Sequence, residues 1–251
     1  MSDPQPVACV SPGGIVRFLS LVAAGLVAAH VGFMTLRFAF GRDRVLGVAR
    51  FFNLDSERSI PTWFSAFLLA TAAALLGLCA THHARRRDPM SGRWAALAWI
   101  FAFLSLDEIA GIHEYLGRIL RDVTELDRWT YFVWPIPAIV LVAVLYVAYR
   151  PWFAALDRPT RRGILTAAAI FLTGAAGMEL LGGAYWSRVG ARTMDLVYAS
   201  ITTIEETLEM VGMLVFIHVL LQYVAVRGWG LQFGVDTGPG LSRKVRPAGP
   251  E

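Results

Sequence analysis

Residues 94–114 read WAALAWIFAFLSLDEIAGIHE, an apolar run of membrane-spanning length that contains three carboxylates and one imidazole. About 20 consecutive apolar residues are needed to cross the hydrocarbon core of a bilayer. An ionised side chain at that depth costs about 2.5–3.5 kcal/mol, so such residues usually face the interior of a helix bundle and mark a functional site. This stretch therefore predicts a membrane helix that carries part of a site.

The whole chain has the composition of a polytopic membrane protein. It contains 251 residues, of which 56% are hydrophobic, and its mean hydropathy is +0.52. We predict an all-α fold, a bundle of six transmembrane helices. The predicted spans are residues 15–36, 62–81, 93–116, 131–149, 163–186 and 196–224. They form one domain over residues 14–227, between an N-terminal tail (residues 1–13) and a flexible C-terminal tail (residues 228–251) that is rich in Gly and Pro.

The distribution of positive charge predicts the orientation. The formal net charge is +4, and arginines gather in residues 82–93 and 150–162 and in both tails, whereas the alternate loops mix them with Asp and Glu. Positive loops remain in the cytoplasm, so both termini should be cytoplasmic in a bacterial-type inner (plasma) membrane. The lipid bilayer explains the charge, and no nucleic-acid partner is expected. His82 and His83 beside this arginine run predict a solvated turn.

Ionisable residues also interrupt three other spans, at similar depth. His30 lies in the first span, Glu179 in the fifth and Glu209 in the sixth. With a rise of 1.5 Å per residue, these residues and the pair Asp107/Glu108 all lie about 14–17 residues from the cytoplasmic end of their helices. His113, Glu114, Glu205 and Glu206 lie about a helical turn or more nearer the outer surface. The sequence therefore predicts one site in the outer half of the bilayer.

Helical spacing places several of these acids on common faces. Glu205 and Glu209 are four residues apart, and Thr202 extends their stripe by one turn. Glu179 is flanked at helical spacing by small residues, which allow close approach of membrane helices; these are Ala175, Ala176, Gly182 and Gly183. We therefore expect the carboxyl group of Glu179 to lie where the packing between helices is tightest.

The composition of this cluster suggests a site for a divalent metal ion. No Lys or Arg lies in the same layer, so either cations or protons must balance the carboxylates. Oxygen donors with some nitrogen suit Zn, Fe or Mn, as in metal-dependent membrane enzymes or metal-handling proteins. The Glu-x-x-His motif of dinuclear helical bundles is absent. The predicted metal ligands are His30, Asp107, Glu108, His113, Glu114, Glu179, Glu205 and Glu209.

Two other functions fit the same residues. Protonated carboxylates could drive a proton-coupled transporter of small solutes, although the inner half of the bundle has few polar residues. They could instead serve as general acids in a metal-free membrane enzyme that acts on a lipid or isoprenoid substrate. Neither the oligomeric state nor the choice between enzyme and transporter follows from these residues alone.

Overall fold

The computed structural model describes residues 11–41, 47–56, 58–113, 115–116, 119, 135–189 and 195–229. Within these ranges the regular structure is entirely helical, as the sequence predicts. The elements are α1 (Pro12–Phe40), the 3₁₀ helix η1 (Ala49–Phe52), α2 (Ile60–Arg85), α3 (Ser91–Ala110), α5 (Pro135–Ala155), α6 (Arg158–Leu172), the π-helix η2 (Thr173–Met178), α7 (Glu179–Val189) and α8 (Leu196–Val226).

Five of the described helices are long and apolar enough to cross a membrane. They are α1, α2, residues Pro137–Ala155 of α5, the continuous helix Arg158–Val189 and α8. These helices support an integral membrane protein. The third predicted span corresponds to α3, which is not among the five; it carries three charged residues, Arg93 near its start and Asp107 and Glu108 in its last turn.

The helices begin and end where local chemistry requires. Ser11 caps α1 by accepting a hydrogen bond from the backbone N–H of Gly14 at 3.1 Å, and Ser59 caps α2 in the same way. At the other ends, α1 stops at Gly41 and α3 at Gly111, whose φ angles are 62° and 60°. Glycine adopts this left-handed conformation without a steric penalty. The run predicted as one span over residues 93–116 is therefore interrupted at Gly111.

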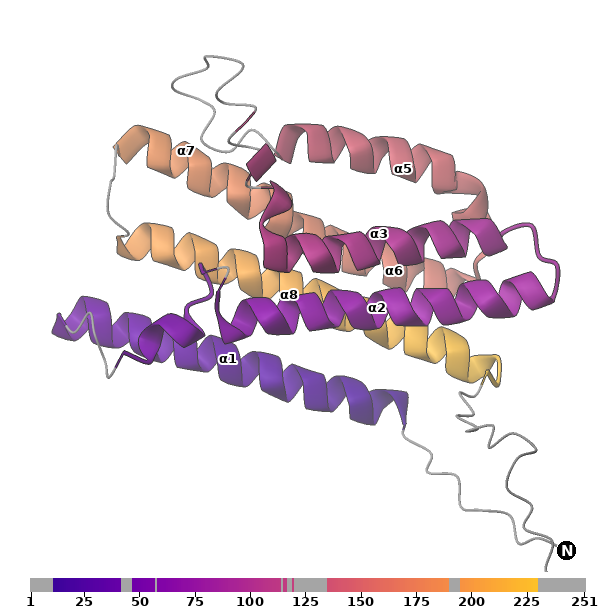
Figure 1. Cartoon of the computed structure of the whole chain (residues 1–251), viewed down its shortest axis with the longest axis horizontal. Helices are drawn as coiled ribbons and strands as arrows, with labels where there is room; N and C mark the ends of the chain where they lie inside the picture. Colours follow the sequence, from indigo (N-terminus) through magenta and orange to yellow (C-terminus); the bar gives the residue numbers. More distant parts are fainter. Residues whose placement is uncertain are drawn as a thin grey trace, which may run out of the picture.

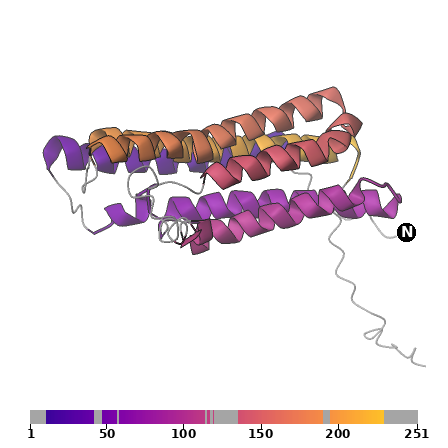
Figure 2. The same ribbon diagram turned by 90° about the horizontal axis from the view of Figure 1, so that it is seen from above.

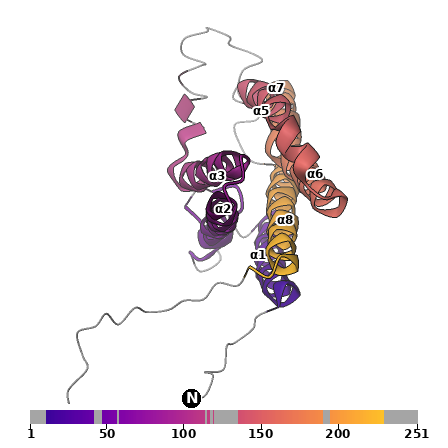
Figure 3. The same ribbon diagram turned by 90° about the vertical axis from the view of Figure 1, so that its right-hand side faces the viewer.

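The helices form two layers (Figures 1, 2 and 3). The pair α2–α3 makes one layer, and α1, α8, α5 and the continuous helix Arg158–Val189 make the other. Helix α8 is central and packs against α1, α2 and α6. Successive helices alternate in direction, so the start of α1 and the end of α8 lie at the same end of the bundle as the α2–α3 and α5–α6 connections (Figure 1). We call this the turn end.

Helices α2 and α8 are the most buried of the described helices, whereas α5 is peripheral. Leu68 and Leu76 of α2 and Ile217 and Leu220 of α8 are fully buried. Half of the apolar stretch of α8 is buried (50%), against 6% for residues Pro137–Ala155. The outer surface of α5 is therefore available to lipid, and its inner surface is only loosely covered.

The turn end contains a packed cluster in place of the solvated turn expected for His82 and His83. His83 Nδ1 lies 2.7 Å from Asp88 Oδ2, and its Nε2 lies 2.9 Å from the Tyr223 hydroxyl. The His83 ring stacks on Trp94, with centroids 5.4 Å apart, and only 15% of its side chain is exposed. The expectation of a solvated residue is wrong for His83. Its neighbours in the sequence are charged, but Tyr223 of α8 packs against it and helps to bury it.

Candidate functional site

A cavity of about 1180 Å³ lies between α3, α5, α6, α7 and α8. Most of its wall is apolar, with contributions from Leu97, Phe101, Leu104, Leu141, Leu145 and Phe171. Towards the turn end it reaches Tyr149 and Trp152 on α5. The acids line its other half, away from the turn end.

Glutamates from three helices share this acidic half of the cavity. Glu108 comes from α3, Glu179 from α7, and Glu205, Glu206 and Glu209 from α8. The carboxyl groups of Glu179 and Glu205 are within hydrogen-bonding contact. Glu209 lies close enough to Glu108, Glu179 and Glu206 to interact with them electrostatically. Carboxyl groups this close require protons or bound cations between them.

A glycine and a π-helix place Glu179 against α8. A Cβ atom on Gly174 would lie 2.8 Å from the backbone carbonyl oxygen of Glu205 and 3.0 Å from Cγ of Glu209. Only glycine therefore fits at this crossing. Gly174 belongs to η2, which leads directly into Glu179, and single π-turns within α-helices are frequent at functional sites.

The small residues that the sequence analysis singled out contribute less than Gly174 does. Ala176 and Gly182 are buried. A Cβ on Gly182 would make an ordinary contact, 3.5 Å from Cγ2 of Ile201. The helix that carries Glu179 does pack closely, against α8, but the tight points are at Gly174 and at Gly212, where an added Cβ would lie 2.7 Å from the backbone nitrogen of Phe171.

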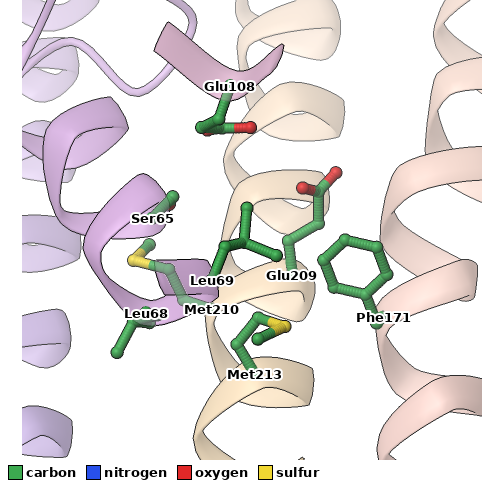
Figure 4. A pocket seen from close by; sticks show the side chains of 8 residues that line it. All are labelled: Ser65, Leu68, Leu69, Glu108, Phe171, Glu209, Met210 and Met213. Carbon is green, nitrogen blue, oxygen red and sulfur yellow. The ribbon is translucent and has the colours of Figure 1, made fainter. Parts of the chain in front are cut away.

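A second, water-sized pocket adjoins the cavity (Figure 4). It has a volume of about 10 Å³, and the carboxyl groups of Glu108 and Glu209 point towards the same space. Ser65 of α2 also lines it, and the Ser65 hydroxyl is buried without a hydrogen-bond partner. Nothing in the sequence distinguishes Ser65, because hydroxyl residues in membrane helices commonly bond to their own backbone, as Thr71 does.

His30 lies apart from the acids and has two protein partners. It is 1% exposed. Its Nδ1 accepts a hydrogen bond from the backbone N–H of Leu54 at 3.1 Å, and its Nε2 lies 3.1 Å from the Thr203 hydroxyl. An accepting Nδ1 leaves the proton on Nε2, which donates to Thr203. His30 does not line the cavity. Because both of its ring nitrogens have protein partners, metal binding by His30 would break one of these hydrogen bonds.

Asp107, in the last turn of α3, forms a local pair with His113, which lies just past the end of the helix. Asp107 Oδ1 accepts a hydrogen bond from the backbone N–H of His113 at 2.8 Å, and Oδ2 lies 3.0 Å from His113 Nδ1. The turn at Gly111 brings the two residues together. Both line the cavity. Glu114, predicted as a further ligand, lies outside the described residues.

The described part of the chain contains no group of three His, Cys, Asp or Glu side chains arranged to hold a metal ion. Metal binding by the predicted residues stays a prediction. Glu206, which the sequence analysis placed nearer the surface and did not count among the ligands, lines the same cavity as Glu209. Residues three positions apart lie on the same face of a helix, so Glu206 and Glu209 can both reach the cavity.

Within the described ranges the regular structure is all helical, and five of these helices are long and apolar enough to cross a membrane, which indicates a helical membrane protein. Residues 18–224 match the model of a family described as "Domain of unknown function (DUF8692)", and the chain belongs to this family. The match extends from α1 to the last turns of α8 and so includes the cavity and its acids. Neither a curated protein nor a solved structure matches the chain.

Proposed function

We propose that this protein is a metal-dependent enzyme of the plasma (inner) membrane that binds a lipid-like molecule in the cavity and acts on its head group. The observation that carries the proposal is the division of the cavity, with glutamates from α3, α7 and α8 at one end and an apolar wall over the rest. Such a division matches a molecule with a polar head and a long apolar chain.

The size and lining of the cavity support an apolar occupant. Pockets for small molecules are commonly about 300–1,000 Å³, and this cavity is about 1180 Å³. Its wall between the acids and Trp152 is formed mainly by aliphatic and aromatic side chains. A small polar solute would gain little from such a wall, so the lining argues against proton-coupled transport of small solutes.

The charge of the acidic half supports a bound cation. The described residues that line the cavity include five glutamates and no Lys or Arg. A divalent ion would balance two of these carboxylates, and it would also act as a Lewis acid towards a head-group oxygen. Carboxylate ligands suit Mn or Fe. A metal that requires mainly imidazole ligands would fit this site less well.

The topology proposed with this function has six spans, with α3 as the third. The start of α1 and the end of α8 lie at the turn end, together with the arginine-rich α2–α3 connection (Figure 1). An even number of crossings places the start of α1 and the end of α8 on the same side of the membrane. The positive-inside tendency favours the cytoplasm as that side. The acids would then lie in the outer half of the bilayer.

A second candidate function is acid catalysis without metal. The contact between the carboxyl groups of Glu179 and Glu205 favours it, because one shared proton can stabilise such a pair and then be given to a substrate. This enzyme would use the same cavity and the same class of substrate.

Purification in nanodiscs without chelator, followed by elemental and lipid mass spectrometry, tests these functions. We expect about one equivalent of a divalent metal and a co-purified amphiphile. Bound amphiphile without metal, with activity that survives EDTA, would favour acid catalysis. Uptake of a small solute into liposomes that collapses with the pH gradient would overturn both enzyme proposals.

A further inference from the structure

Ser65 differs from the other hydroxyl residues around it on α2. Thr71 and Thr81 donate to the backbone carbonyl oxygens of Phe67 and Leu78 on their own helix. The Ser65 hydroxyl has no partner although its residue is only 6% exposed. Buried hydroxyl groups are nearly always hydrogen-bonded, so an unpaired one indicates a missing water or ligand.

The space in front of this hydroxyl is sized for a single atom or water. The pocket of about 10 Å³ is bounded by Ser65, by the carboxylates of Glu108 and Glu209 and by apolar side chains that include Leu68 and Met210 (Figure 4). This is about the volume that one water molecule needs. Glu108 and Glu209 also line the large cavity, so the pocket adjoins the place where a head group would lie.

The chemistry of these three groups indicates the occupant. Two carboxylates balance a charge of +2, and the neutral hydroxyl of Ser65 is the third group that offers oxygen to the ion. Hard divalent ions such as Mn²⁺ and Mg²⁺ prefer oxygen ligands, whereas Zn²⁺ and Fe²⁺ also favour imidazole. The two histidines predicted as ligands are engaged elsewhere, His30 with Leu54 and His113 with Asp107.

We propose that Ser65, Glu108 and Glu209 form a binding site for one hard divalent cation, of the Mn²⁺ or Mg²⁺ type, between α2, α3 and α8. The side of the ion that faces the cavity stays open to an oxygen atom of the occupant's head group. This inference rests on the proposed function and deepens it, because it locates the cation at the Ser65 pocket and not at the Glu179–Glu205 contact.

The test uses Mn²⁺ alone as the probe and does not depend on a bound lipid. Full-length protein in nanodiscs is stripped with EDTA, and Mn²⁺ is titrated while the EPR signal of the free ion is recorded. We expect one ion per chain. Ser65→Ala should raise the dissociation constant for Mn²⁺ by about tenfold, within the range found when a supporting group of a metal site is lost. Glu209→Gln should abolish binding.

Ser200→Ala is the matched control, because Ser200 is an exposed residue of α8 whose hydroxyl bonds to the carbonyl oxygen of Leu196. It should bind Mn²⁺ like the unaltered protein. Thermal unfolding without metal provides a second measurement. Ser65→Ala removes an unpaired hydroxyl and should melt at the same or a higher temperature, so loss of binding in this variant cannot be ascribed to misfolding. Added Mn²⁺ should raise the melting temperature of the unaltered protein more than that of Ser65→Ala.

Two results would overturn the inference, and they have different consequences for the proposed function. Equal Mn²⁺ affinity in Ser65→Ala and the unaltered protein would place the ion elsewhere among the glutamates and leave the metal-dependent function intact. Absence of Mn²⁺ binding would mean that the pocket holds a water molecule only, and the metal-dependent function would fail with it unless elemental analysis finds another metal.

Discussion

The two ends of the bundle use similar side chains in opposite ways. At the turn end, His83 pairs with Asp88 and Tyr223 and is enclosed by aromatic rings. In the acidic half, Ser65 is buried without a partner and the glutamates surround a cavity. Polar groups that satisfy one another inside a packed cluster hold helices together. Polar groups gathered around open space have capacity left for a ligand, so the comparison points to the acidic half as the functional one.

We expect the largest effect from a substitution at Gly174, which sets the distance between η2 and α8 in the acidic half. We expect Gly174→Ala to lower the free energy of unfolding by about 1–3 kcal/mol, the usual cost of overpacking. The added Cβ would lie 2.8 Å from a backbone oxygen of α8, and backbone cannot move aside as a flexible side chain can. Unfolding in detergent would measure the change. Gly182→Ala is the control and should be nearly neutral; equal effects of the two would contradict the tight crossing.

At the turn end, His83→Ala tests whether the cluster is structural. The variant loses two hydrogen bonds and a stacking contact, and we expect a loss of about 1–2 kcal/mol of stability. Unfolding followed by tryptophan fluorescence would report it, since Trp94 lies on the His83 ring. His82→Ala removes only a stacking contact with Trp229 and should cost less. Bound metal and lipid should be unchanged in both variants; a loss of either would link the two ends functionally.

A larger side chain on the cavity face of α5 tests whether the apolar wall of the cavity binds the lipid-like molecule. Ala143 lines the cavity and its neighbour Val144 does not, and Val144 is 59% exposed. We expect Ala143→Trp to lower the amount of co-purified amphiphile by about tenfold, equivalent to 1.4 kcal/mol of binding free energy, with Mn²⁺ affinity unchanged. Lipid mass spectrometry would measure it. Val144→Trp should retain the amphiphile, and equal losses in the two variants would place the lipid on the outer surface of α5.

The smallest expected effect is a pH dependence at the turn end. The backbone N–H of Met90 and the His83 side chain hold the pKa of the Asp88 carboxyl below its ordinary value of 3.8. A carboxyl group with a lowered pKa contributes stability that is present above pH 3.8 and is lost as the pH falls through its folded-state pKa. Between about pH 5 and pH 3 the melting temperature should therefore fall more steeply in the unaltered protein than in Asp88→Asn. Parallel curves would show that Asp88 adds no pH-dependent stability.

Much of the fold could be predicted because helix length and helix ends depend on nearby residues. The apolar runs correspond to α1, α2, α5, the continuous helix Arg158–Val189 and α8. The predicted ends were less accurate where a single glycine decides them, as at Gly111. The similar depths assigned to Glu108, Glu179 and Glu209 agree with their place on one cavity wall, because depth follows from counting residues along straight helices.

The partners of individual polar residues could not be predicted in the same way. Ser65 and Thr71 are alike in sequence terms, yet Thr71 bonds to its own helix, whereas the Ser65 hydroxyl has no protein partner and Ser65 lines a pocket together with Glu108 and Glu209. His30 of α1 shares the predicted depth of the acids, but its partners are the backbone N–H of Leu54 and the hydroxyl of Thr203. His83 belongs to an arginine-rich turn but packs against α8. In each case the deciding contact comes from another helix.

The sequence by itself determined that this protein is helical, that its helices suit a membrane, and that ionisable residues interrupt those helices at a common depth. These properties depend on composition and on residues a few positions apart. Only the tertiary structure decided which polar groups are paired and which surround a cavity. That outcome depends on the rotation of each helix about its axis and on which helices become neighbours, and both are set by packing between residues far apart in the chain.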